Sequence, residues 1–417
     1  MTAPRNWKMP VLYAVLALLA LAVFGFGTPG GEQTVFRFAS AGDFFAIPDL
    51  TVASRTTALT LSFVLVALAA TALVATWQRW ETGIWSARVL PIAIGLFFVL
   101  SLLTWGASNR GFIDLTYLLA GALALSVPLV FGAMAGVIGE RSGIINIAIE
   151  GQLLAGAFCA GVVASVMTNP YVGLIAALFG GMAVAVILVF FAVKYWVDQI
   201  IIGVVVNVLV VGLTSFLYST VLTQDSATWN SSQPLPDLPI PVLSGIPVLG
   251  PVLFNQTVLV YLMYVIVAVL SVYIFRSRWG LRMRAIGEHP KAADTVGIHV
   301  NKWRVINTVA AGAIAGLGGA YLTVGEGLAF GKEMSAGQGY IALAAMILGR
   351  WNPVGAMCAA LLFGFTKNLG NVFRSIDSPL PDDFLHMLPY IVTVFAVAGF
   401  VGRVRPPAAE GKPYAKQ

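Results

Sequence analysis

Charged residues are scarce in this sequence, and their scarcity excludes most classes of soluble protein. Only 10% of the 417 residues are Asp, Glu, Lys or Arg, whereas 59% are hydrophobic. A soluble domain carries about 25% charged residues, more than twice the fraction found here. So small a fraction is typical of a chain that lies largely within a lipid bilayer.

Cysteine and histidine are also rare, which argues against metal centres and catalytic sites. The two cysteines, Cys159 and Cys358, lie in apolar runs without partners at the spacing of metal ligands, and we interpret both as small buried residues. The three histidines are isolated from one another along the chain. The sequence therefore predicts no catalytic residue, no metal site and no cofactor bound to this chain.

A nucleotide-binding loop is missing as well. The segment nearest to the pattern Gly-x-x-x-x-Gly-Lys-Ser/Thr runs from Gly327 to Glu333, but it has one residue too few and no hydroxyl. The apolar runs also lack the series of Asp, Glu and His residues that marks proton-coupled transporters. If the protein moves a solute uphill, we expect the energy to come from another subunit.

The sequence does contain a series of twelve apolar runs, most of them close to the roughly 20 residues that span a bilayer as a helix. They cover residues 10–27, 57–76, 89–105, 117–138, 144–168, 171–193, 200–222, 257–275, 305–324, 337–349, 352–371 and 387–402. Only Glu150 and Lys367 place a charge inside them. The sequence predicts an all-α polytopic membrane protein with about twelve transmembrane segments, of which 337–349 is short or re-entrant.

The basic residues are distributed unevenly between the loops. If the sides alternate from a cytoplasmic N-terminus, 18 of the 24 Lys and Arg residues lie on the cytoplasmic side and five on the other. This bias is typical of membrane proteins. It predicts a multi-pass protein of the cell (inner) membrane with both termini cytoplasmic. It also explains the net charge of +6 without a nucleic-acid partner.

Three features stand out around and between the apolar runs. Residues 1–116 contain three predicted transmembrane helices, the first of which is retained because no small-x-small cleavage site follows it. A long cytoplasmic loop is predicted at 276–304, and residues 403–417 form a cytoplasmic tail. The external segment 223–256 is rich in proline, which prevents a long helix and favours an extended cap.

A short internal similarity suggests a repeat. The segment that begins Asn169-Pro170 resembles the segment that begins Asn352-Pro353, and both continue into a Gly/Ala-rich run. In the predicted topology the two runs cross the membrane in opposite directions. This is the pattern of an inverted-topology repeat, with a binding pathway at the repeat interface. Chance similarity between two helices of similar composition is the alternative.

Polar side chains enter an apolar run between Gly139 and Gln152. A carboxylate in lipid is costly, so Glu150 has to face a partner, water or a pathway. Gly143 and Gly151 flank the polar stretch and permit a broken helix, whose exposed backbone ends can bind a polar solute. We predict Asn146, Glu150, Gln152 and Asn207 as pathway residues. The alternatives are that Glu150 pairs with Lys367 or caps a helix, and that Asn207 makes a helix-to-helix hydrogen bond.

The cytoplasmic loop carries a second informative segment. Pro290 suits the first position of a helix and Gly297 its end, so a short helix with two alanines is predicted between them. Such a helix fits a shallow groove of another protein. A solvated, positively charged loop is the alternative, and the residues alone do not decide between the two.

These segments resemble a known family. Ala292-Ala293-x-x-x-Gly297 resembles the core of the coupling loop in ABC importer permeases, although Lys291 stands where the family commonly has Glu. The phrase from Gly287 to Ile298 is similar to the branched-chain amino acid, ribose and nucleoside permeases. The segments 143–152 and 335–355 look most like the nucleoside permeases that work with basic-membrane-lipoprotein binding proteins. The resemblance covers about 117–402, which implies that these residues form the permease domain and that residues 1–116 are an N-terminal extension outside it.

The resemblance implies a transport subunit without enzyme activity of its own. It implies a related second permease, an ATPase subunit that holds ATP and Mg²⁺, and an extracellular substrate-binding lipoprotein as partners. By the same resemblance, ten residues would form the ATPase-coupling segment: Gly287, Glu288, His289, Pro290, Lys291, Ala292, Ala293, Asp294, Gly297 and Ile298. The alternatives are an ion-coupled secondary transporter and an ABC permease for simple sugars.

Overall fold

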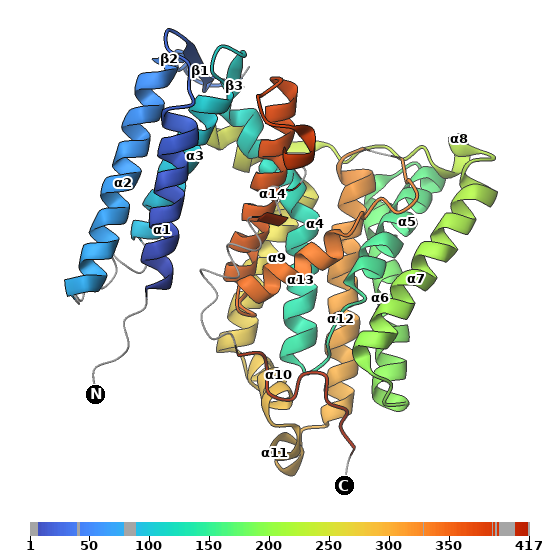
Figure 1. Cartoon of the computed structure of the whole chain (residues 1–417). Helices are drawn as coiled ribbons and strands as arrows, with labels where there is room; N and C mark the ends of the chain where they lie inside the picture. Colours follow the sequence, from blue (N-terminus) through green and yellow to red (C-terminus); the bar gives the residue numbers. More distant parts are fainter. Residues whose placement is uncertain are drawn as a thin grey trace. The chain divides into compact units, whose positions relative to one another are not determined.

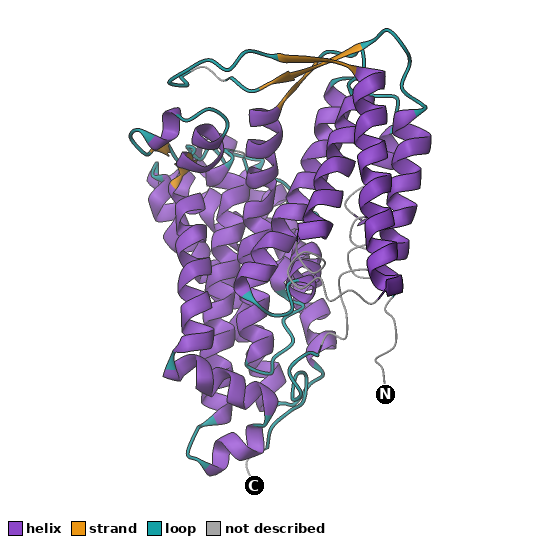
Figure 2. Cartoon of the chain, turned by 90° about the vertical axis from the view of Figure 1, so that its left-hand side faces the viewer, coloured by secondary structure: helices purple, strands orange, loops and turns teal. Residues whose placement is uncertain are grey.

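The computed structural model describes residues 7–39, 42–78, 89–327, 329–385, 387, 390–391 and 405–415, and helices make up most of them (Figure 2). Most of the predicted run 387–402, and His386, lie outside the described residues. The chain forms two compact units. The first comprises residues 1–121, 241–253 and 366–402, and the second comprises residues 122–240, 254–365 and 403–417.

The first unit is built from three neighbouring helices and a small sheet. The helices are α1 (Lys8–Leu19), extended by a π-helical turn at Ala20–Gly25, α2 (Ser54–Gln78) and α3 (Leu90–Gly106), and they lie side by side in Figure 1. The strands are β1 (Gln33–Arg37), β2 (Leu50–Ala53) and β3 (Phe112–Asp114), in the order β2-β1-β3. The β1 strand is antiparallel to β2, with Gln33 opposite Ala53, and parallel to β3.

The end of α14 (Pro353–Ser375) also belongs to the first unit and packs against α3. The Phe373 side chain is fully buried, and a Cβ at Gly106 would lie 2.9 Å from its ring. Arg110 donates a hydrogen bond to the Asp377 carbonyl, and Asn368 donates to the Leu118 carbonyl at 2.8 Å. The end of α14 therefore packs against α3 and the segment that follows it, which precede it by more than 200 residues.

The second unit is a bundle of long apolar helices. Its helices are most of α4 (Leu115–Arg141), α5 (Ile149–Met167), α6 (Pro170–Lys194), α7 (Gln199–Leu217), α8 (Ser226–Trp229), α9 (Val258–Arg276), α10 (Arg278–Glu288), α11 (Pro290–Thr295), α12 (Val300–Ala320), α13 (Gln338–Leu348) and the start of α14. Two short strands, β4 (Asp237–Pro239) and β5 (Asn255–Thr257), pair antiparallel. The Pro-rich segment 223–256 contains no helix longer than five residues, as its prolines predict.

Eight helices of the described part are long and apolar enough to cross a membrane. Two shorter apolar helices, Leu90–Gly106 and Gln338–Leu348, add to them, and the second is the predicted short segment. The chain is thus a multi-pass helical membrane protein. The predicted run 144–168 is shorter as a helix, because α5 begins only at Ile149.

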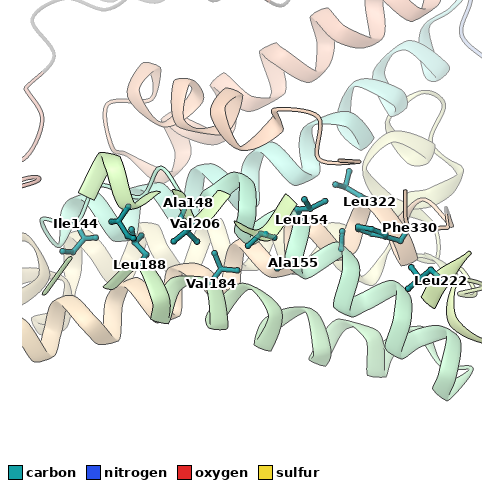
Figure 3. Packing of buried hydrophobic residues seen from close by; sticks show 13 residues of the cluster. Ile144, Ala148, Leu154, Ala155, Val184, Leu188, Val206, Leu222, Leu322 and Phe330 are labelled. Atoms are coloured by element: carbon teal, nitrogen blue, oxygen red, sulfur yellow. The ribbon is translucent and has the colours of Figure 1, made fainter. Parts of the chain in front are cut away.

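The core of the second unit lies where α5, α6 and α12 meet with their backbones in close contact. A Cβ at Gly316 would overlap the Ala177 carbonyl of α6, and one at Gly319 would overlap the Leu153 carbonyl of α5. Small residues let helix backbones approach to this distance. Gly316 and Gly319 therefore serve the close packing of α12 against α6 and α5. Figure 3 shows the neighbouring apolar cluster, in which Leu154, Val184 and Val206 from α5, α6 and α7 pack together.

The two similar Asn-Pro segments both begin a helix. The Asn169 side chain accepts a hydrogen bond from the Tyr171 backbone N–H at 2.9 Å, and Asn352 accepts from Val354 at 3.0 Å. Proline occupies the first helical position in both segments. Proline has no backbone N–H, but an N–H at this position would have no partner within the helix, so no hydrogen bond is lost. Shared helix-start chemistry therefore explains this part of the similarity.

The structure corrects the prediction for one cysteine. Cys159 is partly buried, but Cys358 on α14 is exposed on the surface of the chain. Both thiols are free. A small residue such as cysteine fits an exposed position of an apolar helix as well as a buried one, so its apolar surroundings in the sequence do not predict burial.

Candidate functional site

The chain leaves its helical path between α4 and α5, and this break positions the predicted polar residues. Gly143 has a φ of +88°, a conformation that side-chain-bearing residues rarely adopt, so the helix ends there. The backbone N–H of Ile145 then donates to Gln199 Oε1 of α7 at 2.7 Å. The break at residues 142–148 is thus held by the side chain of a neighbouring helix. The other flanking glycine, Gly151, lies inside α5 and does not break it.

Asn146 and Gln152 face each other across this break. Asn146 Nδ2 donates to Gln152 Oε1 at 3.1 Å, and Gln152 Nε2 donates to Asn146 Oδ1 at 3.0 Å. Both side chains are fully buried. Two amides paired in this way satisfy one donor and one acceptor each, which lowers the cost of burying them. The pair ties the break to the second turn of α5.

Glu150 holds the beginning of α13. Its carboxylate accepts hydrogen bonds from Ser335 Oγ at 2.6 Å, from the Gly337 N–H at 2.8 Å and from the Gly339 N–H at 2.7 Å. The side chain is 7% exposed. The N-terminal ends of α5 and α13 both favour a negative charge at this place. Glu150 therefore caps the N-terminal end of α13, which is one of the alternatives that the sequence left open for it.

Asn207 of α7 links the same two helices. Its Oδ1 accepts from the Gly151 N–H at 2.8 Å, and its Nδ2 donates to the Ile147 carbonyl at 2.9 Å and to the Tyr340 hydroxyl at 3.1 Å. Gly151 is needed for this approach, because a Cβ there would lie 3.0 Å from Asn207 Oδ1. The structure therefore brings all four predicted residues to the junction of α5, α7 and α13.

The predicted short helix of the cytoplasmic loop is also present, as α11 (Pro290–Thr295). Pro290 is its first residue, and Gly297, with a φ of +83°, ends it. The two alanines differ: Ala293 is buried, whereas Ala292 is exposed. Val296, which follows the helix, is 74% exposed. In Figure 1, α10 and α11 lie at the end of α12 at which that helix begins.

Comparison with known proteins agrees with this architecture. The family described as branched-chain amino acid transport system, permease component, matches residues 118–397, more than half of the chain. The chain belongs to this permease family. No solved structure matches it.

Individual relatives of the permease cover most of its length. It is 36% identical to the guanosine ABC transporter permease protein NupQ of Bacillus subtilis over 316 residues, 72% of this chain and 97% of that protein. It is 37% identical to the nucleoside ABC transporter permease protein NupC of Lactococcus lactis over 318 residues, 72% of this chain and 98% of that protein. It is 32% identical to a putative glucose ABC transporter permease of Haloferax volcanii over 256 residues, 60% of this chain and 76% of that protein. The chain is therefore an ABC transport subunit and not an enzyme.

The four predicted residues of the polar junction can bind and position other groups. They supply one carboxylate and three amides, and each of the four makes hydrogen bonds to protein groups. Among the described residues, no group of three or more His, Cys, Asp or Glu could hold a metal ion. The N-terminal ends of α5 and α13 meet at the junction, an arrangement similar to transporter cores in which discontinuous helices surround the solute.

Several residues of the junction were not predicted. Ser335, Gly337 and Gly339 bind the Glu150 carboxylate, Tyr340 binds Asn207, and Gln199 holds the break. The first three lie in the glycine-rich sequence 325–339, which leads into the predicted short run 337–349, so the sequence carries a usable signal for them. Gln199 and Tyr340 carry no comparable signal in the sequence.

Substitution of Asn207 tests how much the junction contributes to stability. Asn207→Leu is expected to lower the free energy of unfolding by about 2–4 kcal/mol, because the Gly151 N–H and the Ile147 carbonyl lose their partner. Tyr340→Phe removes only one acceptor and is expected to cost about 1 kcal/mol or less. The thermal unfolding midpoint of the purified permease in detergent measures both. Equal midpoints for the two variants would contradict the assignment.

Proposed function

We propose that the chain is the transmembrane permease subunit of an ATP-driven importer that passes nucleosides into the cytoplasm. The observation that carries this proposal is the similarity to a guanosine permease and a nucleoside permease over nearly their whole lengths, 97% and 98%. The chain would lie in the cell membrane with about twelve segments arranged as an inverted repeat. The bias of basic residues supports cytoplasmic termini.

A second, related permease is expected to complete the channel. Three organisms each supply two relatives that match this chain at different levels, and in two of these organisms the relatives are named for nucleosides. In Bacillus subtilis they are 36% and 26% identical to it, and in Lactococcus lactis 37% and 22%. In both organisms the two proteins share a named solute class. This pairing supports a heteromeric transporter in which the present chain takes one of two distinct positions.

The energy would come from an ATPase subunit that holds ATP and Mg²⁺, with no cofactor on this chain. We assign the contact with that subunit to the coupling segment, residues 287–298. The exposed Ala292 of α11 and the exposed Val296 directly after α11 offer an apolar surface that suits a groove of another protein. ATP binding drives transport if the two conformations of the permease bind the ATPase differently.

The solute would be delivered by an extracellular binding lipoprotein and released past the polar junction. Asn146, Glu150, Gln152 and Asn207 are the proposed pathway residues, acting through the helix ends that they hold. The permease domain would extend over 117–402, with 1–116 as an added N-terminal part and 403–417 as the tail. A nearly uncharged pathway suits an uncharged solute that is bound weakly and released quickly.

A simple sugar is the second candidate solute. It is favoured by the 32% identity to a putative glucose permease, although that match covers 60% of this chain. Nucleosides contain a sugar, so the two solute classes share hydroxyl groups that the pathway would contact. Direct competition separates them.

Uptake into membrane vesicles tests the proposal. Vesicles that contain both permeases, the ATPase and the binding lipoprotein are expected to take up labelled guanosine or uridine at least about tenfold faster with ATP than without it. Excess unlabelled nucleoside, but not glucose, is expected to compete. An ATPase variant without its phosphate-loop Lys is the control. Uptake by the chain alone, driven by an ion gradient, would contradict the proposal.

A further inference from the structure

The C-terminal segment 405–415 lies along the coupling segment instead of extending away from the protein. The backbone N–H of Ala409 donates to the Gly287 carbonyl at 2.9 Å, and the N–H of Ala408 donates to Glu288 Oε2 at 3.2 Å. In Figure 1 the C-terminal end passes beside α10 near the beginning of α12. The tail is thus bonded directly to the residues at which the coupling segment begins.

Arg304 of α12 fastens the same tail from the other side. Its side chain is only 1% exposed, and its guanidinium donates to the Lys412 carbonyl at 2.8 Å and to the Ala409 carbonyl at 3.4 Å. A buried cation is costly unless it is hydrogen-bonded. The tail carbonyls supply acceptors for this cation, so the docked position of the tail and the buried position of Arg304 depend on each other.

The tail also carries an apolar anchor. Tyr414 is 9% exposed and packs in a cluster with Ile286, Ala293 and Val300, from α10, α11 and α12. Asn301 Nδ2 donates to the Tyr414 carbonyl at 3.3 Å. Ala293 is the inward-facing alanine of the coupling helix, so the phenol ring of the tail lies directly behind the surface that we assign to the ATPase.

A third set of contacts leads from the tail to the helix break. The Gly411 N–H donates to the Gly143 carbonyl at 3.3 Å, and a Cβ at Gly143 would lie 2.7 Å from the Arg304 guanidinium. Glu410 is hydrogen-bonded to Glu140 at the end of α4, and burial raises the pKa of Glu410. The tail therefore touches the beginning of the break that leads to Asn146 and Gln152.

We propose that residues 405–415 form a strap that transmits movement of the coupling segment to the break at 142–148. This inference rests on the proposed function, since it takes residues 287–298 as the ATPase contact. The strap is bonded at Gly287 to the coupling segment and at Gly143 to the break, with Arg304 holding both. A push on α11 reaches the polar junction through it. Arg304 and Tyr414 are positioning residues in this scheme.

Weakening the anchor tests the strap without removing it. In the complete transporter with its binding lipoprotein, Tyr414→Ser is expected to lower nucleoside uptake about fivefold or more while ATP hydrolysis changes less than about twofold. The loss would be one of coupling, because the ATPase contact surface on α11 is unchanged. Tyr390 is exposed, so Tyr390→Ser is the matched control. It is expected to leave the rates of uptake and of ATP hydrolysis unchanged.

A reversible cross-link separates transmission from a merely structural role. Cys is placed at Asn301, whose side chain donates to the Tyr414 carbonyl, and in place of Tyr414 itself. Cys159 and Cys358 are replaced by Ala, and a reducible bis-methanethiosulfonate joins the two thiols. Cross-linking is expected to restore uptake, and reduction to remove it again, at an unchanged rate of ATP hydrolysis. Failure of the cross-link to form, or its formation without a change in uptake, would overturn the strap. A Tyr414→Ser variant with normal uptake would overturn it too, as would a parallel loss of uptake and hydrolysis.

The unsubstituted transporter distinguishes failure of the strap from failure of the proposed function. If it shows no ATP-dependent nucleoside uptake, the proposed function is wrong, and the strap, which rests on that function, is wrong with it. If it shows uptake and the tail variants match it throughout, the proposed function stands and the strap is wrong.

Discussion

Gly297→Trp is expected to reduce ATP-driven uptake by roughly 100-fold while the permease stays folded in the membrane. A Cβ at Gly297 meets no atom within 4 Å, so the indole extends outward and not into the protein. The cost within the permease is the positive φ of +83°, about 1–2 kcal/mol. At the ATPase contact, however, a large ring beside α11 would hold the two proteins apart. Uptake in vesicles and the yield of folded permease measure the two effects separately.

Gly31→Trp is the matched control for this substitution. Gly31 has a φ of +85° and likewise no atom within 4 Å of an added Cβ, so the backbone strain and the open surroundings are the same. It lies in the N-terminal unit, far along the chain from the coupling segment. Uptake by this variant is expected to remain within about twofold of the unsubstituted permease. Equal losses in the two variants would show that strain, and not the ATPase contact, is responsible.

Glu150→Ala is expected to be the most damaging single substitution at the polar junction. It leaves the Ser335 hydroxyl and the Gly337 and Gly339 N–H groups without their acceptor. A charge-assisted hydrogen bond is worth about 1.5–3 kcal/mol, so a loss of about 4 kcal/mol or more in unfolding free energy is expected. Uptake should fall to background. Glu150→Gln is expected to lose less stability and uptake than Glu150→Ala but more than none. Its amide oxygen still accepts a hydrogen bond, whereas its NH₂ group faces another donor. Thermal unfolding in detergent and uptake in vesicles measure these effects.

Glu333→Gln provides the comparison for the loss of a carboxylate. Glu333 is exposed and belongs to the same connection into α13. Its neutralisation is expected to change stability by less than about 0.5 kcal/mol. If Glu150→Gln were as stable as Glu333→Gln, the carboxylate could not be what holds the start of α13.

Local signals in the sequence predicted the bounds of α11 almost to the residue. Pro290 and Gly297 act through their own backbone conformations, so their effect does not depend on the rest of the fold. The burial cost of a carboxylate likewise predicted that Glu150 has a partner. Which partner it has depends on packing, because Ser335 lies 185 residues away. Asn207 makes the hydrogen bonds between helices that were expected as an alternative. As with Glu150, burial explains why the polar side chain has partners, and packing decides which ones.

The least predictable part was the tail. Arg304 was counted among the cytoplasmic charges, yet its side chain is buried and bonded to residues more than 100 positions later. The tail itself contributes mainly backbone groups to these bonds. Carbonyl and N–H groups are present in every residue, so a sequence gives no sign of where they will be used. The exposed Cys358 was missed because apolar surroundings do not distinguish a helix face toward protein from one toward lipid.

The packing of α3 against α14 in the first unit sets an order of events during synthesis. Arg110 and Asp377, which are hydrogen-bonded, are 267 residues apart. At roughly 5–20 residues per second, about 13–50 s pass between the translation of these two residues. During that time the N-terminal helices are complete but lack the ring of Phe373 that fills the space beside Gly106. The first helices to be made are thus among the last to reach their final packing, and the nascent chain has to keep their unfinished face covered by lipid or by the insertion machinery.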